Sequence, residues 1–314
     1  MPNTRLPAKP SGQRQLGAKA GRVWQNKTLY LLLLPTIVYF MVFRVWPIVN
    51  MRLAFFDYRA RGPWEWVGLK YFKMLLKSSA FSDILTNTLI ISFMKYVLLF
   101  PAFVMFALLL NELRLNSFRK YVQIVSYLPH FLSWVVIAGI WKSFLSPADD
   151  SAINIILSLF GQQSVDLLTD KGAIRWVLML CEAWRSLGWD SIIYYTAIIN
   201  IRADIYEAAI LDGASRKDII LHIILPELLI PMTTVFILNL GFFMSAGFDQ
   251  VYNFTNGSVN SVIDILDTYV NRVGIENAQY SLGTAVSLIK GVVGVILVYI
   301  THVTSKKITG EGVW

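Results

Sequence analysis

Apolar runs alternate with polar segments along the whole chain, and six of the runs are predicted to be membrane-spanning helices. They are Leu29–Phe43, Leu89–Leu110, Val122–Phe144, Ile174–Ile199, Leu228–Phe248 and Leu282–Val303. The first run is short, but no small-residue cleavage site follows it, so it is expected to remain as an uncleaved span. The pattern predicts an all-α polytopic membrane protein with six transmembrane helices.

The polar segments between the runs predict how the chain is divided. The expected parts are a basic cytoplasmic tail at 1–27, a transmembrane domain at 28–305 with external segments at 47–86, 145–173 and 249–281 and a loop at 201–226, and a C-terminal tail at 306–314. The first tail has no apolar period, which is typical of a disordered segment. Apolar residues recur at helical spacing between Val262 and Val273, which predicts a short amphipathic helix at the outer membrane interface.

Composition and charge agree with this division and indicate its orientation. Hydrophobic residues make up 55% of the 314 residues and charged residues 15%, a balance typical of a membrane protein. The segments assigned to the cytoplasm hold fourteen Lys or Arg, and the external segments hold eight. The positive-inside rule therefore places both termini and the 201–226 loop in the cytoplasm. Cys181 is the only cysteine and the three His are scattered, so neither a disulfide nor a metal site is expected.

The 201–226 loop is charged and contains the signals of two short helices separated by a turn. Asp204 and Glu207 have the spacing of a capping box, in which two side chains satisfy the free amides of a first helical turn. Gly213 predicts the end of the first helix, because glycine adopts the left-handed conformation without strain. Ser215 and Asp218 predict the start of a second helix. The loop is therefore expected to be a helix-turn-helix in water.

Eight residues in this loop carry a resemblance to a known family. They are Glu207, Ala208, Ala209, Asp212, Gly213, Ala214, Leu225 and Pro226. At these spacings they resemble the EAA loop of the membrane subunits of bacterial ATP-binding-cassette (ABC) importers, where the loop is the coupling helix that docks on the ATPase subunit. The resemblance extends from Leu29 to the C-terminus and is strongest to the sugar and polysaccharide branch related to the larger maltose-importer permease. Gly247–Phe254 and Lys306–Trp314 resemble permeases for alginate and pectin oligosaccharides.

The resemblance implies a fold, a location and a set of partners. The fold is the type I ABC-importer permease fold in the inner membrane. The implied partners are a second, homologous permease subunit that completes a heterodimer, an ATPase subunit dimer and an extracytoplasmic sugar-binding protein, besides membrane lipid. The sequence contains no Gly-x-x-x-x-Gly-Lys-Ser/Thr loop, so ATP and Mg²⁺ are expected on the partner ATPase and no cofactor on this chain. Nucleic acid is not an expected partner, because the basic tail is typical of a topogenic segment.

The fourth span is unusual because three charged residues lie well inside it. Glu182, Arg185 and Asp190 lie among Trp, Leu, Ile and Tyr, and each charge at bilayer depth costs about 2.5–3.5 kcal/mol. Glu182 and Arg185 are three residues apart, so they are expected to pair along one helical face. Trp189 lies seven residues after Glu182, about two helical turns, and so is on the same face. A carboxylate, a guanidinium and an indole on one face suit a sugar, whose hydroxyls need partners and whose apolar ring faces stack on aromatic rings. The alternative is an internal salt bridge that locks two helices together.

The resemblance to the maltose-type permease implies a sugar site formed by the spans before and after the loop. With Asp190 added from the charge pattern, the predicted substrate-binding residues are Glu182, Arg185, Ser186, Trp189, Asp190, Asn239, Phe242 and Phe243. Lys95, Lys142, Arg185 and Lys290 favour an acidic sugar if they face the cavity. If they reach to the headgroups instead, they say nothing about the substrate and a neutral sugar remains open.

Together these features predict the membrane-spanning subunit of an ATP-driven importer, which moves an oligosaccharide or polysaccharide, such as an alginate-like acidic chain, by alternating access. It is expected not to be an enzyme. A stand-alone secondary transporter is the alternative, with Glu182 and Asp190 as a proton relay. An enzyme acting on lipid-linked sugar is a third class, which the lack of a catalytic motif disfavours.

Overall fold

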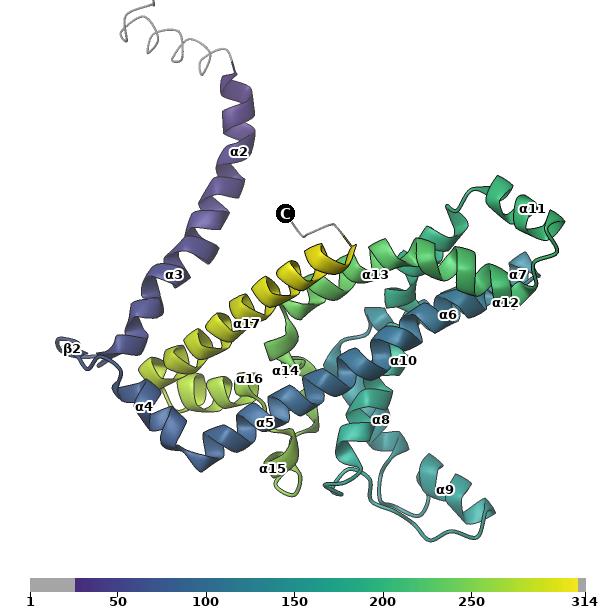
Figure 1. The fold of residues 1–314 in the computed structure, drawn as a ribbon. Coiled ribbons are helices and arrows are strands. Elements are labelled where there is room, and N and C mark those ends of the chain that lie inside the picture. Colours follow the sequence, from purple (N-terminus) through teal and green to yellow (C-terminus); the bar gives the residue numbers. More distant parts are fainter. Residues whose placement is uncertain (1–25, 310–314) are drawn as a thin grey trace, which may run out of the picture. The chain divides into compact units, whose positions relative to one another are not determined.

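The structure is a computed structural model, and it describes residues 26–309 (Figure 1). Most of the predicted N-terminal tail and the last residues of the C-terminal tail, 310–314, lie outside the described residues. The chain forms two compact units, Met1–Leu53 and Ala54–Trp314, and each is described by itself.

The described part of the first unit, residues 26–53, is helical. It comprises α2 (Lys27–Phe40), the π-helical η1 (Met41–Val45), α3 (Trp46–Asn50) and the beginning of the 3-10 turn η2 (Met51–Phe55). Together with the rest of η2 they form one apolar helix of 29 residues. The predicted end of this span at Phe43 is therefore too early. Pro47 does not stop the helix; it directly follows the π-helical η1, an irregular turn of the kind that accompanies helix bends.

The second unit begins with a small β-hairpin, so the chain is mostly helical rather than all-α as predicted. Strand β1 (Phe56–Asp57) pairs antiparallel with β2 (Glu65–Trp66). Gly62 lies in the connection with a φ of 108°, a left-handed conformation that favours glycine. The Tyr71 hydroxyl donates a hydrogen bond of 2.8 Å to Asp57, which attaches the hairpin to the next helix. Burial raises the pKa of Tyr71 to about 12, so this donor keeps its proton.

Helices make up the rest of the second unit. In chain order they are α4 (Lys70–Lys77), α5 (Ser79–Met94), π-helical η3 (Lys95–Leu99), α6 (Phe100–Glu112), α7 (Asn116–Tyr127), 3-10 turn η4 (Leu128–Phe131), α8 (Trp134–Phe144), α9 (Ala152–Leu159), α10 (Ile174–Ile199), α11 (Ala203–Leu211), α12 (Arg216–Ile219), π-helical η5 (Ile220–Ile224), α13 (Leu225–Leu240), 3-10 turn η6 (Phe243–Ser245), α14 (Phe248–Phe254), α15 (Asn260–Ile263), α16 (Leu266–Tyr269), π-helical η7 (Val270–Glu276) and α17 (Tyr280–Thr309).

Four helices in the described part of the chain are long and apolar enough to cross a membrane. They are Lys27–Phe55, Ser79–Glu112, Arg216–Leu240 and Tyr280–Thr304, and a fifth span results if the bent pair formed by Asn116–Phe131 and Trp134–Phe144 counts as one. Helix α10 has the predicted bounds of the fourth span, but its four charged residues, Arg175, Glu182, Arg185 and Asp190, make it less apolar than the others. The number of spans and the side on which each terminus lies remain predictions.

The predicted third span is not one straight helix. Helices α7 and α8 meet at an angle of 106°. Pro129 lies in the 3-10 turn η4 between them, and the Ser133 side chain then accepts a hydrogen bond from the backbone N–H of Val136 at 3.4 Å and caps α8. A proline followed by an N-capping serine ends one helix and begins another, which is why Val122–Phe144 is broken.

The predicted fifth span differs at both ends. Its helix begins at Arg216, inside the predicted 201–226 loop and just after the turn at Gly213, and ends at Leu240 instead of Phe248. Beyond Leu240 the backbone leaves the helical conformation, with φ of 42° at Ala246 and 92° at Gly247. A Cβ on Gly247 would lie 2.6 Å from the Lys95 ammonium, so the close approach of the long helix Ser79–Glu112 requires glycine here.

The last of the predicted external segments, 249–281, folds back into the protein. The predicted amphipathic helix at the membrane interface is therefore wrong. Ile263, Ile265 and Leu266 are fully buried. The apolar positions that fit an interface therefore face the protein core. A buried loop has backbone groups that need partners from elsewhere in the protein.

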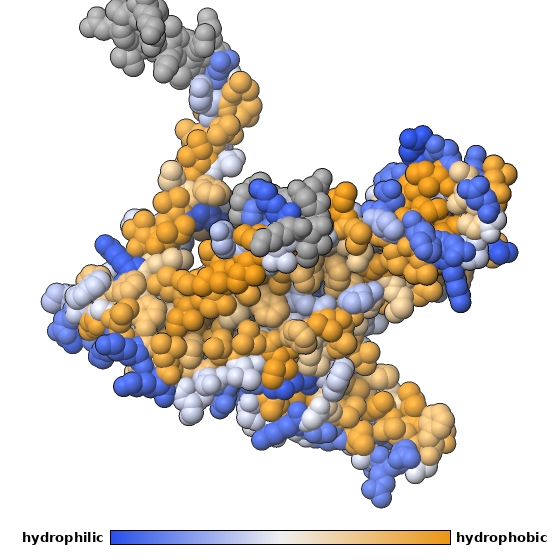
Figure 2. All heavy atoms as spheres, viewed as in Figure 1, coloured by the Kyte–Doolittle hydropathy of each residue, from blue (hydrophilic) through white to orange (hydrophobic). Residues whose placement is uncertain are grey.

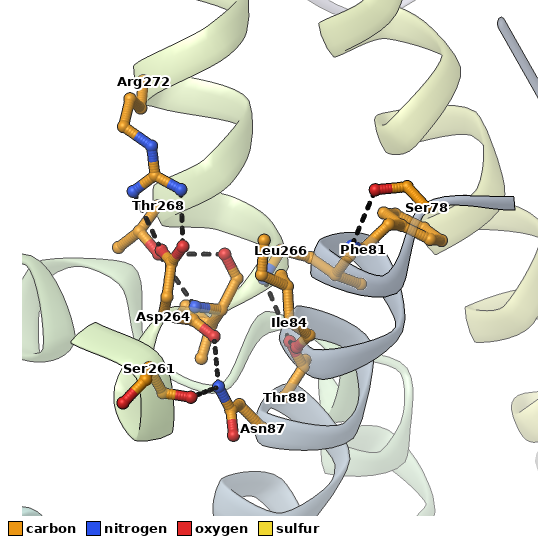
Figure 3. A network of polar contacts seen from close by, with 11 residues as sticks. Ser78, Phe81, Ile84, Asn87, Thr88, Ser261, Asp264, Leu266, Thr268 and Arg272 are labelled. Carbon is orange, nitrogen blue, oxygen red and sulfur yellow. Dashed lines mark hydrogen bonds and ion pairs between the residues drawn. The ribbon is translucent and has the colours of Figure 1, made fainter. Parts of the chain in front are cut away.

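Polar side chains on α5 supply some of these partners, as Figure 3 shows. Asn87 donates to the carbonyls of Ser261 at 3.1 Å and Asp264 at 3.2 Å. The Thr88 hydroxyl accepts from the N–H of Leu266 at 3.0 Å, and Arg272 pairs with the Asp264 carboxylate at 2.5 Å. The three bonds of Asn87 and Thr88 hold the loop against α5, and the Arg272–Asp264 pair lies within the loop.

Helix α10 is central to the second unit, with α6, α7 and α13 packed against it. One buried cluster joins α6, α10, the η5 turn and α13, and it includes Ala107, Tyr194, Ile224 and Leu228. Figure 2 shows apolar residues over α17 and α13 and hydrophilic residues gathered at the end that carries α11. This end is where the predicted cytoplasmic loop lies.

Candidate functional site

A cavity of about 340 Å³ lies between three elements: the long helix Ser79–Glu112, α10, and the chain that leaves the helical conformation after α13. Aromatic side chains from the long helix contribute much of its wall, among them Tyr96, Phe100 and Phe103. Apolar and aromatic walls with a few polar groups are typical of small-molecule sites.

Five of the eight predicted substrate-binding residues line this cavity. They are Glu182, Asp190, Asn239, Phe242 and Phe243. The structure thus brings together residues from the spans before and after the loop. Arg185, Ser186 and Trp189 are not among the lining residues.

Glu182 forms the strongest polar contact in the cavity, with Lys95 of the long helix. The Lys95 Nζ lies 2.6 Å from Glu182 Oε2, and each side chain is 15% exposed. The Ser186 hydroxyl donates to the other carboxylate oxygen of Glu182 at 3.1 Å. Glu182 therefore pairs with Lys95 of another helix rather than with Arg185 as predicted.

Arg185 and Trp189 instead contact the break between α7 and α8. The Arg185 guanidinium lies 5.0 Å from the centre of the Trp134 ring and donates to the His130 carbonyl at 3.4 Å. Trp189 stacks on the His130 ring, with 4.4 Å between ring centres. These contacts position the bent span against α10. Trp189 also lines a second cavity of about 600 Å³, which shares Asp190 and Asn239 with the first.

The end of α13 and the stretch after it line the cavity, and two of their backbone carbonyls accept hydrogen bonds from the long helix. The Ser92 hydroxyl donates to the Phe243 carbonyl, and the Tyr96 hydroxyl donates to the Asn239 carbonyl. Non-helical backbone at membrane depth is tolerated where it is buried in protein or lines a cavity, and broken helices of this kind accompany binding sites in transporters. Sequence reasoning missed Ser92 and Tyr96, which lie close to Lys95 in the second predicted span.

The four basic residues considered for acidic sugars are all engaged in other contacts. Besides Lys95 and Arg185, Lys142 lies 5.8 Å from the centre of the Phe254 ring. Lys290 pairs with Asp267 at 2.5 Å beside a separate cavity of about 640 Å³. The wall of the 340 Å³ cavity thus contains Lys95 with its partner Glu182, together with Asp190.

Asp190 takes part in no ion pair among the described residues. The cavity wall on this chain therefore holds more negative than positive side chains. It offers acceptors for sugar hydroxyls and no free ammonium or guanidinium group.

The predicted helix-turn-helix of the loop is confirmed. Helix α11 ends at Leu211, and Gly213 follows with a φ of 79°. The Ser215 side chain caps α12, and the Asp218 carboxylate accepts in return from the Ser215 N–H at 2.9 Å. Asp204, however, does not cap α11. The helix begins after Arg202, and the Asp204 carboxylate pairs with that residue at 2.6 Å.

The predicted coupling residues occupy two different environments. Glu207, Ala208, Asp212, Gly213 and Pro226 are exposed, whereas Ala209, Ala214 and Leu225 are partly buried against the cluster between α6, α10 and α13. Helix α11 also has two large apolar side chains exposed on the surface, Ile210 at 63% and Leu211 at 87%. Exposed apolar residues rimmed by charges are typical of a surface that contacts another protein.

A comparison with protein families assigns the class. The model of the family described as "Binding-protein-dependent transport system inner membrane component" matches residues 79–309. The chain belongs to this family, so it is a multi-pass inner-membrane permease subunit, a transport component rather than an enzyme. This confirms the resemblance to ABC-importer permeases drawn from the loop.

Individual relatives narrow the branch of the family. Protein LplB of Bacillus subtilis is 39% identical over 294 residues, which are 92% of this chain and 92% of that protein. The polygalacturonan/rhamnogalacturonan transport system permease protein YteP of Bacillus subtilis is 37% identical over 296 residues, which are 92% of this chain and 91% of that protein.

Solved structures share the fold. A chain of a bacterial ABC transporter involved in the import of the acidic polysaccharide alginate matches with a TM-score of 0.87 and 32% identity, over 93% of this chain and 99% of that chain. A bacterial alginate ABC transporter in complex with an alginate pentasaccharide-bound periplasmic protein matches with the same TM-score and identity, over 93% and 98% of the two chains.

Proposed function

We propose that this chain is one of two different permease subunits of an ABC importer that moves an acidic, uronate-containing oligosaccharide into the cytoplasm. A periplasmic-type binding protein delivers the sugar, and an ATPase dimer docks on α11 and supplies the energy. The chain has six spans and cytoplasmic termini, with the bent pair α7 and α8 as the third span and α10 as the fourth.

The observation that carries this proposal is the position of the cavity between the two helices that flank the loop. Helix α10 leads into the loop and α13 leads out of it, and both contribute to the cavity wall through Glu182, Asp190 and Asn239. A displacement of α11 by the ATPase therefore acts directly on the walls around the sugar. Alternating access follows if this displacement opens the cavity to one side and closes it to the other.

The chemistry of the cavity supports a sugar ligand. Phe242, Phe243 and Tyr96 provide aromatic faces, and the Asp190 and Asn239 side chains provide hydrogen-bonding groups for hydroxyls. The relatives support the acidic class, because YteP is named for polygalacturonan and the solved structures are of alginate importers. Since no basic group of this wall is free, the sugar carboxylates are bound by other parts of the importer. Family membership disfavours the stand-alone proton-coupled transporter.

Transport in a reconstituted system tests the proposal. The chain is assembled in proteoliposomes with the other permease subunit, the ATPase and the binding protein encoded with it, and uptake of a labelled oligogalacturonide or oligoalginate is measured. Uptake should require ATP and binding protein and should persist in the presence of a proton uncoupler. Uptake that follows a proton gradient without ATP would contradict the transport mechanism. ATP-driven uptake of neutral arabino- or galacto-oligosaccharides alone would contradict the substrate class.

A further inference from the structure

The long helix Ser79–Glu112 lines the cavity but has no direct chain connection to the loop. The segments that enter and leave the loop, α10 and α13, are joined to it covalently. The long helix contacts the loop through its last residue instead. The carboxylate of Glu112 accepts a hydrogen bond of 2.8 Å from the Arg216 Nε, and Arg216 is the first residue of α12.

Apolar packing supports the same connection. Val104 and Ala107 of α6 are buried in one cluster with Ile219 of α12 and Ile224 of η5. Tyr206 of α11 packs against this cluster, and burial raises the pKa of its hydroxyl, as expected for a side chain that is partly withdrawn from water. The loop and the end of α6 therefore form one packed body.

A second cation holds the end of α6 in place. Arg119 of α7 donates to the Leu113 carbonyl, which follows the last residue of α6, and to the Tyr195 hydroxyl of α10 at 3.2 Å. The end of the long helix is thus linked to α7 and α10 by Arg119 and to the loop by Arg216. A displacement of the loop cannot leave this end behind without breaking these bonds.

The long helix also has a point at which it can bend beside the cavity. Its regular hydrogen bonding changes to a π-helical turn at Lys95–Leu99, and Pro101 follows two residues later. Such irregularities are common causes of helix bending and are frequent at functional sites. Lys95, Tyr96 and Leu99 line the cavity at this turn.

We propose that Glu112 and Arg216 are positioning residues that transmit the movement of the coupling loop to the long helix and so to the third wall of the cavity. This inference rests on the proposed function, because it assumes that the loop is displaced by an ATPase. The pair is partly exposed, Arg216 at 53% and Glu112 at 34%, and exposed ion pairs add little to stability. Variants of the pair should therefore fold, which makes the role testable.

The test measures coupling in the assembled importer in proteoliposomes, as sugar transported per ATP hydrolysed. Glu112→Gln and Arg216→Gln should each lower this ratio by roughly fivefold or more, while basal ATP hydrolysis persists. The double variant Glu112→Arg with Arg216→Glu should restore the ratio, because it rebuilds the pair with exchanged charges. Glu112→Asp should keep part of the coupling. Arg59→Gln serves as the matched control, because it breaks another exposed ion pair, Arg59 with Glu65, that lies in the β-hairpin away from the loop and the cavity, and it should leave the ratio unchanged.

Two results would overturn the inference. One is an unchanged transport ratio in both single variants. The other is a charge-exchanged double variant that is no better than the singles, which would assign the loss to local damage. Ala209→Glu separates failure of this inference from failure of the proposed function. If Ala209→Glu uncouples transport and Glu112→Gln does not, the inference alone fails. If Ala209→Glu also leaves transport coupled, the loop is not the coupling element and the proposed function fails.

Discussion

Lys95 and Glu182 join two walls of the cavity, with the ammonium nitrogen 2.6 Å from the carboxylate oxygen. Lys95 comes from the π-helical turn of the long helix, and Glu182 from the middle of α10. Each charge neutralises the other in surroundings that are otherwise aromatic and aliphatic. The pairing therefore makes it possible to keep two charged residues in this cavity wall. Lys95, the one cationic side chain that lines the cavity, is engaged by Glu182.

Breaking this pair on one side should destabilise the protein. Lys95→Met leaves the Glu182 carboxylate without its counter-ion, and loss of one partner from a buried pair typically costs about 3–5 kcal/mol. Thermal unfolding in detergent should show the loss, and the double variant Lys95→Met with Glu182→Leu should recover most of it. Lys290→Met provides the comparison, since it breaks a pair of similar exposure beside another cavity. A single variant as stable as the parent would show that water or another cation replaces Lys95.

Substitution of Gly247 should also be costly. Its φ is 92°, and a Cβ would lie 2.6 Å from the Lys95 nitrogen, so Gly247→Ala combines backbone strain with displacement of the ion pair. Strained backbone of this kind costs on the order of 1–3 kcal/mol. The unfolding temperature should fall, and ATP-driven uptake should fall with it. Gly257→Ala is the control, because a Cβ there meets no atom within 4 Å, and it should behave like the parent protein.

The charge of Asp190 should affect the preference between acidic and neutral sugars. Asp190→Asn removes the unpaired carboxylate from the wall and keeps a side chain of similar size. The uptake KM for an oligogalacturonide should then fall relative to that for its methyl ester by up to roughly tenfold, which corresponds to 1.4 kcal/mol of removed repulsion. The methyl ester is the matched substrate, since it removes the carboxylate charge of each uronate and adds only a methyl group. An unchanged ratio would show that Asp190 does not face the sugar.

Gly213 should be replaceable only by residues that tolerate a left-handed backbone. Its φ is 79° and a Cβ would meet no neighbour, so the effect of a substitution comes from the backbone alone. Gly213→Val should distort the turn at a cost of about 1–2 kcal/mol, and sugar-stimulated ATP hydrolysis should fall. Gly213→Asn should retain most of the stimulation, because asparagine visits this conformation readily. Equal activity in both variants would show that the turn does not transmit movement.

The sequence predicted well those features that depend on near neighbours in the chain. The capping pair Ser215 and Asp218, the turn at Gly213 and the bounds of α10 each follow from a few adjacent residues, and the loop motif identified the family. The break at Pro129 and Ser133 was visible as a proline followed by a capping serine, but the apolar run around it dominated the interpretation.

Features that depend on distant residues were not predictable in the same way. Glu182 has Arg185 one helical turn away, and only the fold shows that Lys95 approaches more closely. The apolar residues between Val262 and Val273 fit a membrane interface and a protein core equally well, because helical spacing does not identify what the face contacts. The cavity likewise depends on the end of α13 at Leu240, where Ser92 and Tyr96 of the long helix bond to the carbonyls of Phe243 and Asn239.

The hydroxyls of Ser92 and Tyr96 have an evolutionary consequence. They occupy the carbonyls of Phe243 and Asn239, so recognition of the sugar falls to side chains such as Asp190 and Asn239 rather than to the backbone. Side chains change by single substitutions, whereas a backbone site changes only with the fold. Permeases of this family can therefore diverge from one carbohydrate to another by point mutation while the framework that carries the site stays the same.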